Sequence, residues 1–315
     1  MSLGIKRLFG AARSRRGFLR SAVGVTGGVA LAGERVVVAA DVSERLPTVP
    51  FGKYEITRLI VGSNPFYGYS HSVPVLDRLM QEWNTTDRVC QTLLACEQNG
   101  INTYQGNGQE RSVIDLARYR AEGGKMHVIS LGTCDAIPQV LEQVKPIGLA
   151  HHGENTDRLF REGKLEEVHE FTKRVRQTGV MVGVSTHQPE VIARIEELGW
   201  DVDFYMGCVY NRTRTPDQLR KQLGEVPEPP TEVYLQGDPP RMFRVLRQTK
   251  KPCLAFKILA AGRRAGSARA VQQALREAFA SIKPSDCVIV GMFPRFKDEV
   301  AENADCVRHI LSQRA

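Results

Sequence analysis

The sequence has no apolar run long enough to cross a membrane as a helix. Its apolar N-terminal stretch, residues 21–32, has about 12 residues against the ~20 that a spanning helix needs, and it is rich in glycine. The sequence also lacks a C-x-x-C pair, and its cysteines number seven, an odd count. The cysteine pattern excludes a disulfide framework and a zinc site of that spacing, so we expect mostly free thiols. The short apolar stretch leads us to expect no stable membrane span in the mature chain.

An export signal is predicted near the N-terminus. Arg15 and Arg16 lie within residues 14–20, directly before the apolar stretch, an order that resembles a twin-arginine signal. Small residues allow cleavage after Ala32 or Ala40, and we favour the second, which gives a signal peptide over residues 1–40 and one domain over residues 41–315. The twin-arginine translocase is then a partner during export to the periplasm or another extracytoplasmic space. A basic tail or an uncleaved anchor is the alternative.

The net charge supports this division and removes one class of partner. The chain carries +8, but residues 1–40 hold seven basic residues against Glu34, so their share is +6 and the remainder carries +2. A basic chain suggests nucleic acid or an anionic membrane as a partner. Here the excess belongs to the signal, so we expect no nucleic acid partner and a small-molecule ligand instead.

Short β-prone segments alternate with helical stretches along the rest of the chain, which is typical of an α/β fold with a parallel sheet. Helices are expected to begin near residues 87, 109, 136, 165, 189, 239, 268 and 297. Eight rounds in about 275 residues, without a Gly-rich first turn, favour a (β/α)8 TIM barrel over an open sheet. A hairpin at residues 49–57 is expected to close its bottom. The predicted strands are Arg58–Gly62, Ile101–Gln105, His127–Leu131, Ile147–His151, Val180–Ser185, Asp203–Tyr210, Cys253–Ile258 and Cys287–Met292.

Two long connections interrupt this alternation. Residues 66–86 carry several aromatic side chains, and residues 211–234 are rich in proline and charge. Both follow strands, so in a barrel they emerge at the C-terminal face, where active sites are built. They are interpreted as lids or binding loops, with surface insertions as the alternative.

Polar side chains follow most of the predicted strands and are expected to converge at that face. His152 and His187 suit general acid–base chemistry because imidazole titrates near neutral pH. With Asp135 or Glu154 they could also form an open zinc site, although no H-x-H or H-E-x-x-H spacing supports a metal. The candidate strand-end residues are Ser63, Asn64, Gln105, Asn107, Cys134, Asp135, His151, His152, Glu154, Ser185, His187, Tyr210, Asn211, Arg212, Lys257, Arg295 and Lys297.

Lys257 is a charged residue inside the apolar segment 255–259. Burial of an unpaired ammonium is costly, so its side chain should face a polar partner or an anionic ligand at the barrel mouth. A phosphate or carboxylate clamp, a Schiff-base lysine with a lowered pKa and a structural salt bridge all remain open.

Taken together, residues 51–311 resemble the aldo/keto reductase superfamily. The similarity is carried by four segments in order: Phe51–Ser63 for the hairpin and first strand, Gly183–Val191 for the fifth strand, Phe256–Gly262 for the seventh, and Gly291–Asn303 for the eighth and its helix. The resemblance implies a TIM barrel that acts as an NADP-dependent oxidoreductase on a carbonyl or sugar. It also implies nucleotide contacts from Ser185, Asn211, Lys257, Arg295, Lys297, Glu302 and Asn303.

The catalytic set of that family is largely missing. Gln105 stands where the family has an aspartate, no tyrosine follows at the expected spacing, and the third strand ends without a lysine. Only the histidine is retained, as His152. Tyr67, Tyr69 or a strand-end histidine is the substitute proton donor that the sequence offers.

Three functions therefore remain open from the sequence. The first is an exported oxidoreductase with tightly held NADP, loaded before export, and with His152, His187 and Lys257 as catalytic candidates. The second is a hydrolase, isomerase or lyase that uses His152, His187, Asp135 and Glu154, with or without a metal. The third is a non-catalytic ligand-binding barrel. Fold alone does not decide among them.

Overall fold

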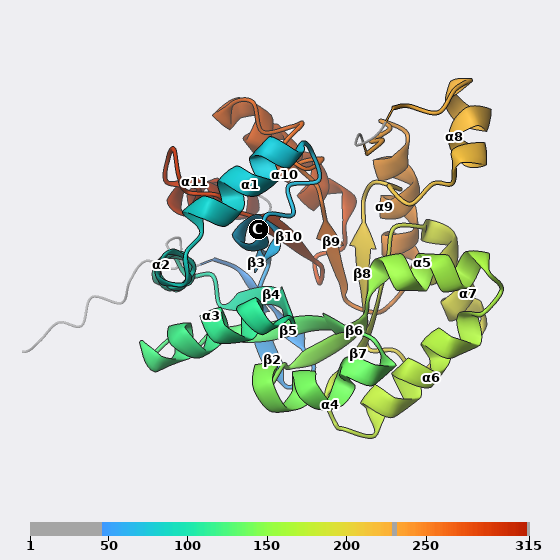
Figure 1. Ribbon diagram of the computed structural model, residues 1–315, viewed down its shortest axis with the longest axis horizontal. Helices are drawn as coiled ribbons and strands as arrows, with labels where there is room; N and C mark the ends of the chain where they lie inside the picture. The colour runs from blue at the N-terminus through green and yellow to red at the C-terminus, as the bar shows by residue number, and fades with distance from the viewer. Residues whose placement is uncertain (1–45, 229–231, 314–315) are drawn as a thin grey trace, which may run out of the picture. The chain divides into compact units, whose positions relative to one another are not determined.

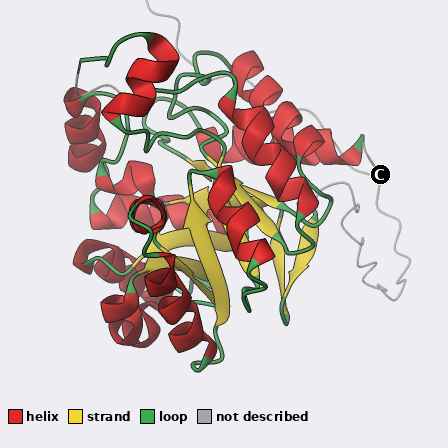
Figure 2. Cartoon of the chain, turned by 90° about the vertical axis from the view of Figure 1, so that its right-hand side faces the viewer, coloured by secondary structure: helices red, strands yellow, loops and turns green. Residues whose placement is uncertain are grey.

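The chain forms a closed barrel of eight parallel strands with helices around it (Figures 1 and 2). The computed structural model describes residues 46–228 and 232–313, so the predicted signal at residues 1–40 lies outside the described residues. Each strand expected from the sequence is present, with its ends displaced by at most two residues, and the predicted (β/α)8 barrel is confirmed. In barrel order the strands are β3 (Leu59–Gly62), β4 (Thr103–Asn107), β5 (His127–Gly132), β6 (Gly148–His151), β7 (Met181–Thr186), β8 (Phe204–Cys208), β9 (Cys253–Phe256) and β10 (Cys287–Gly291), which pairs with β3.

The expected hairpin closes the N-terminal end of the barrel. Strands β1 (Thr48–Phe51) and β2 (Tyr54–Thr57) pair antiparallel across a turn in which Gly52 has φ +60°. The fully buried Phe51 ring packs edge-on against Phe204 inside the barrel, with 4.9 Å between ring centroids. Gly183 is required beneath that ring, because a Cβ there would lie 2.3 Å from Phe204 Cζ. We call this apolar end the floor.

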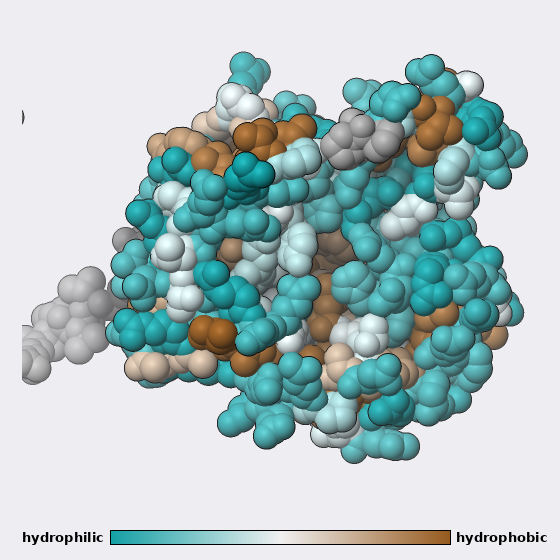
Figure 3. All heavy atoms as spheres, in the orientation of Figure 1, coloured by the Kyte–Doolittle hydropathy of each residue, from teal (hydrophilic) through white to brown (hydrophobic). Residues whose placement is uncertain are grey.

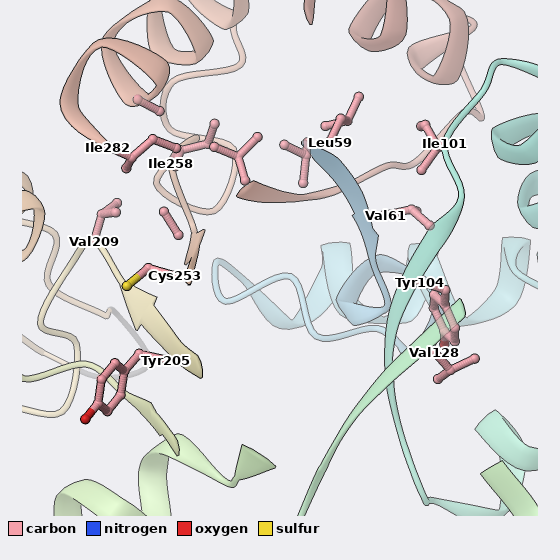
Figure 4. Close-up of a cluster of buried hydrophobic side chains, with 14 of the residues drawn as sticks. Leu59, Val61, Ile101, Tyr104, Val128, Tyr205, Val209, Cys253, Ile258 and Ile282 are labelled. Atoms are coloured by element: carbon pink, nitrogen blue, oxygen red, sulfur yellow. The ribbon is translucent and has the colours of Figure 1, made fainter. Parts of the chain in front are cut away.

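The strands bury both faces, as expected for a parallel sheet under helices. Leu59 and Val61 of β3 point outward and join a core between strands and helices that includes Tyr104 and Val128 (Figure 4). Ile60, between them in sequence, points inward and joins the floor. This period-two alternation divides the apolar side chains between the two cores.

The helices cover the outside of the barrel (Figure 2). Their bounds are α1 (Pro74–Trp83), α2 (Thr86–Gln98), α3 (Glu110–Ala121), α4 (Ile137–Gln139), α5 (Gly153–Arg161), α6 (Leu165–Arg176), α7 (Pro189–Glu197), α8 (Pro216–Leu223), α9 (Asp238–Gln248), α10 (Ala268–Ser281) and α11 (Glu299–Ser312). Short helical turns at Asn64–Tyr67, Cys134–Ala136 and Val140–Val144 complete the set.

Three of these helices were not expected from the sequence. Helices α1 and α8 lie within the two long connections, each with a proline in its first turn, and Thr215 caps α8 in a reciprocal hydrogen-bonded box with Gln218. Helix α5 begins directly after β6, whereas the sequence interpretation placed the helix of that round only from Leu165. Proline was therefore the available sequence signal for α1 and α8, whereas α5 has neither a side-chain cap nor a proline in its first turn.

Two simpler expectations concern cysteine and the membrane. All seven cysteines are free, as expected from their odd number and spacing. Among the described residues, no helix combines the length and the apolar character needed to cross a bilayer.

Candidate active site

A cavity of about 600 Å³ opens at the C-terminal ends of the strands, opposite the floor. In the orientation of Figure 1 the surface is hollowed near its centre, and apolar atoms lie at depth between hydrophilic rims (Figure 3). We call it the mouth cavity. Ten of the strand-end residues expected from the sequence line it: Ser63, Asn64, Gln105, Asn107, His152, Glu154, Ser185, His187, Arg212 and Lys257.

His187, at the end of β7, is held by a buried carboxylate. Its Nδ1 lies 2.7 Å from Asp157 Oδ2, and Asp157 has no exposed surface. Asp157 also accepts hydrogen bonds from the hydroxyls of Thr186 and Thr213. Because a carboxylate only accepts, Nδ1 carries the proton and Nε2 keeps its lone pair, which faces the guanidinium of Arg212 at 3.2 Å. This arrangement orients His187 as a proton acceptor.

Arg212 connects this pair with a second histidine–carboxylate pair. It donates to Glu232 at 2.7 Å and also to Glu154. Glu232 in turn accepts from His71 Nδ1 at 2.9 Å and from the Tyr234 hydroxyl at 2.8 Å. Burial raises the pKa of Glu232, but the hydrogen bond from His71 and the charge of Arg212 outweigh it and lower that pKa to about 2. The two long connections therefore meet at a carboxylate that stays ionised.

His152 lines the mouth cavity and has one unsatisfied ring nitrogen. It directly precedes α5, and its Nδ1 is buried without a hydrogen-bond partner among the described residues. Burial, with the nearby His187 and Arg212, lowers the pKa of His152, so the ring is neutral. Buried polar atoms are rarely left unpaired, and this one is suited to a substrate hydrogen bond. His151 differs: it bonds Thr156 at 2.7 Å, and burial lowers its pKa to about 4, which marks a structural residue.

Lys257 follows β9 in a strained backbone conformation, with φ +60° in a residue that is not glycine. Its side chain is half-buried and lines the mouth cavity. Burial, together with the charges of Arg212 and Arg263, lowers the pKa of Lys257 to about 8, although Cys208 and Glu232 act in the opposite direction. Among the described residues, Lys257 has neither a hydrogen bond nor an ion pair through its ammonium group.

A second cavity of about 280 Å³ adjoins the mouth cavity and runs between α1 and the β9–α10 connection toward β10. Its far end reaches Phe293 and Glu299, where the Glu299 carboxylate accepts from the Phe293 amide at 2.8 Å. Burial raises the pKa of Glu299. The residues that line both cavities are Asn64, Tyr69, His71, Gln105, Phe256 and Lys257.

The residues that the resemblance assigns to the nucleotide are only partly brought together. Ser185 and Lys257 line the mouth cavity, whereas neither cavity is lined by Asn211, Arg295, Lys297, Glu302 or Asn303. Lys297 pairs with Glu302, and the guanidinium of Arg295 lies over the Phe296 ring at 5.3 Å. Asn303 is buried on α11, and the backbone amide of Asn211 bonds Asp238.

The remaining candidates lie outside the mouth cavity. Cys134, Asp135, His151 and Tyr210 do not line it. No group of three or more His, Cys, Asp or Glu side chains within the described residues converges to hold a metal ion. Neither Asp135 nor Glu154 therefore forms a metal-binding group with His152 and His187.

The tyrosines considered as proton donors differ in access. Tyr67 shares a hydrogen bond with Tyr104 at 3.3 Å, and burial raises the pKa of Tyr67 far above its usual range. Tyr69 lines both cavities, but its hydroxyl donates to Gln109 at 3.2 Å. Sequence reasoning missed Asp157, Glu232 and His71, which complete the site. The aromatic and charged composition of the long connections was the available signal for His71 and Glu232.

The sequence matches no protein-family model and no curated protein. Solved structures resemble it in fold. Glycerol dehydrogenase AKR11B4 from Gluconobacter oxydans has 14% identity and a TM-score of 0.53, over 86% of this chain and 96% of that one. Aldo-keto reductase AKR11C1 from Bacillus halodurans, in its holo form, has 10% identity and a TM-score of 0.52 over the same shares. A Gox0644 variant in complex with NADPH has 11% identity and a TM-score of 0.52, over 86% of this chain and 94% of that one. This chain therefore has the fold of the aldo/keto reductases.

Proposed function

We propose that this chain is an oxidoreductase of the aldo/keto reductase type that acts on a small carbonyl compound or a sugar. The observation that carries the proposal is the meeting of His152, His187 and Lys257 around one cavity at the barrel mouth. The fold supports the oxidoreductase type. In this proposal the Lys257 ammonium takes the place of the tyrosine that the aldo/keto reductases use as acid.

Lys257 is the proton donor in this proposal. Carbonyl reduction adds a hydride to carbon and a proton to oxygen, so the site needs an acid that is protonated near neutral pH and still gives up its proton. An ammonium with a pKa of about 8 meets both conditions. In the reverse direction the neutral amine accepts the proton of the alcohol.

The histidines bind and orient the substrate. His152 offers its unpaired Nδ1 to the carbonyl oxygen or a neighbouring hydroxyl. His187, fixed by Asp157, offers the Nε2 lone pair to a substrate hydroxyl in place of Arg212. Together these groups suit a polyhydroxylated carbonyl compound.

NADP is the nucleotide that we propose, and it would supply the hydride. The apolar Phe256, which lines both cavities, and Ile258, which lines the second, fit a flat ring, with Lys257 between them in sequence and Ser185 in the lining of the mouth cavity. The joined cavities have the size of a cofactor site. For Lys297 to hold the adenosine phosphate, its ammonium has to exchange Glu302 for the phosphate.

The test is direct detection of the nucleotide. The full chain, purified after expression in a host that exports it, is denatured, and the released small molecules are examined by ultraviolet absorbance and mass spectrometry. NADPH and NADH are then titrated into nucleotide-free protein, and a panel of aldehydes, ketones and sugars is assayed with each. Protein that neither carries nor binds a nicotinamide nucleotide contradicts the proposal.

A second candidate rests on the two histidine–carboxylate pairs joined by Arg212. A neutral histidine held by Asp157 can take a proton from carbon beside a carbonyl, which is the chemistry of an isomerase or lyase and needs no nucleotide. Hydrogen exchange into a carbonyl substrate in deuterated water, without added nucleotide, favours this candidate. A chain that shows neither exchange nor nucleotide binding is the non-catalytic ligand-binding barrel.

We also propose that the chain works outside the cytoplasm. The support is the twin-arginine pattern at Arg15 and Arg16, followed by a short apolar stretch. Such export moves folded protein, so a nucleotide bound tightly in the cytoplasm is carried along. Fractionation of cells that express the full chain, beside a variant with Arg15→Lys and Arg16→Lys, tests this: the variant should stay in the cytoplasm.

A further inference from the structure

A third cavity lies on the outside of the barrel, between α9, α10 and the β9–α10 connection. Its volume is about 720 Å³, and it shares no lining residue with the mouth cavity or the second cavity. Basic and aromatic side chains dominate its lining. We call it the arginine groove, defined by Arg244, Arg247, Arg263, Arg264, Tyr210 and Tyr234.

The groove has an excess of positive charge. Its lining holds one carboxylate, Glu277, which pairs with Arg264 at 2.6 Å. Arg247 donates to the carbonyl of Ser281 at 2.8 Å, and Arg263 also donates to backbone carbonyls. Carbonyls accept hydrogen bonds without cancelling charge. Arg244 has no hydrogen bond or ion pair within the part of the chain that the structure describes, so three guanidinium charges remain uncompensated.

Aromatic rings flank these charges. The Tyr210 and Tyr234 rings lie 5.2 Å apart between centroids, and the Arg263 guanidinium lies 4.2 Å from the Tyr234 ring centroid. Phe243 adds a third ring to the lining. Flat aromatic and guanidinium surfaces bind ring compounds by stacking and by cation–π contact.

We propose that the arginine groove binds a small molecule that carries a phosphate group on a ring, a phosphorylated sugar or a nucleotide monophosphate. Arg244 and Arg247 are three residues apart on α9 and share one face of that helix. Guanidinium groups bind phosphate through paired hydrogen bonds. They therefore prefer phosphate to anions of lower charge. The tyrosines and Phe243 take the ring.

Calorimetric titration of the whole chain tests the proposal with five probes: glucose 6-phosphate, adenosine monophosphate, glucose, adenosine and inorganic phosphate. We expect one or both phosphorylated compounds to bind at least tenfold more tightly than the matching unphosphorylated compound and than inorganic phosphate. Preference between glucose 6-phosphate and adenosine monophosphate identifies the ring. Equal binding of phosphorylated and unphosphorylated forms, or binding of none, overturns the proposal.

Matched variants place the binding in the groove. Arg244→Ala should weaken binding about tenfold or more, as expected when a hydrogen bond to a charged group is lost, and Arg244→Ala with Arg247→Ala should abolish it. Arg276→Ala removes the same charge from an exposed position of α10 outside the groove and should leave binding unchanged. Unchanged affinity in the double variant overturns the proposal. NADPH titration of the same variant should be unaffected, so failure of the groove leaves the proposed function standing.

Discussion

The floor and the mouth are opposite ends of one barrel and differ in how their side chains are satisfied. At the floor, Phe51, Ile56 and Phe204 are fully buried in an apolar core. At the mouth, His152 has an unpaired buried nitrogen and Lys257 a strained backbone conformation. Unpaired polar atoms and strain cost stability, so they persist where surrounding structure holds them. The floor therefore stabilises the fold, whereas the mouth holds groups that cost stability, as expected of the proposed active site.

Truncation at the floor should give the largest effect on folding. Phe51→Ala removes a buried ring and leaves a cavity beneath Phe204, so we expect the free energy of unfolding to fall by about 3–5 kcal/mol. Chemical denaturation measures it. Phe296→Ala, at a side chain that is 75% exposed, is the control and should change it by less than about 0.5 kcal/mol. Turnover per folded molecule should be unchanged in both, and a loss in Phe51→Ala would show that floor and mouth are not separable.

Removal of the ammonium at the mouth should have the reverse signature. Lys257→Met keeps the length of the side chain but removes the proposed proton donor, so turnover should fall about 10²- to 10³-fold. The free energy of unfolding at neutral pH should stay the same or rise, because a half-buried ammonium without a partner among the described residues is removed. Lys250→Met, on the exposed surface, is the control for loss of charge. Full activity in Lys257→Met would assign proton donation to another group.

The pH dependence sharpens the same contrast. With a pKa of about 8, Lys257 loses its proton above that pH, so kcat/KM for carbonyl reduction should fall about tenfold per pH unit and that for alcohol oxidation should rise. Lys257→Arg should lower turnover because arginine stays charged and does not give up its proton, and the remaining activity should lack this limb. The folded pKa lies below that of an unfolded lysine, near 10.4, so the unfolded chain binds more protons between about pH 8 and pH 10. Stability of the natural chain should therefore rise over that window, and in Lys257→Met the rise should vanish.

The sequence predicted the floor more completely than the mouth, for a physical reason. Strands and hairpin follow local alternation and turn residues, which a linear pattern records. His152, His187 and Lys257 were expected to converge because barrel geometry brings strand ends together, and they do. Asp157 was missed because it lies on α5, a helix that the sequence did not predict, and its contact with His187 joins residues 30 positions apart.

The link between the two long connections was also beyond the sequence. His71 and Glu232 are 161 residues apart, and neither follows a strand directly. Their pairing depends on how α1 and the β8–α9 connection fold over the mouth. Charge and aromatic content marked these segments as functional, but only the folded chain specifies which side chains meet.

The smallest expected effect comes from this link. Glu232→Gln keeps the shape of the side chain but removes the charge that pairs with Arg212 and His71, so the free energy of unfolding should fall by about 1 kcal/mol at neutral pH. The folded pKa of Glu232, about 2, lies below that of an unfolded glutamate, near 4.3. Its contribution is therefore complete above about pH 4 and disappears as pH falls through about 2.

Urea titration at each pH measures this effect. The free energy of unfolding of the natural chain should lose this contribution between about pH 4 and pH 2, and that of Glu232→Gln should not. Glu225→Gln, an exposed neighbour, should behave as the natural chain does. Identical acid profiles for Glu232→Gln and the natural chain would mean that the two connections are held over the mouth by other contacts, and the network would then bear on substrate orientation alone.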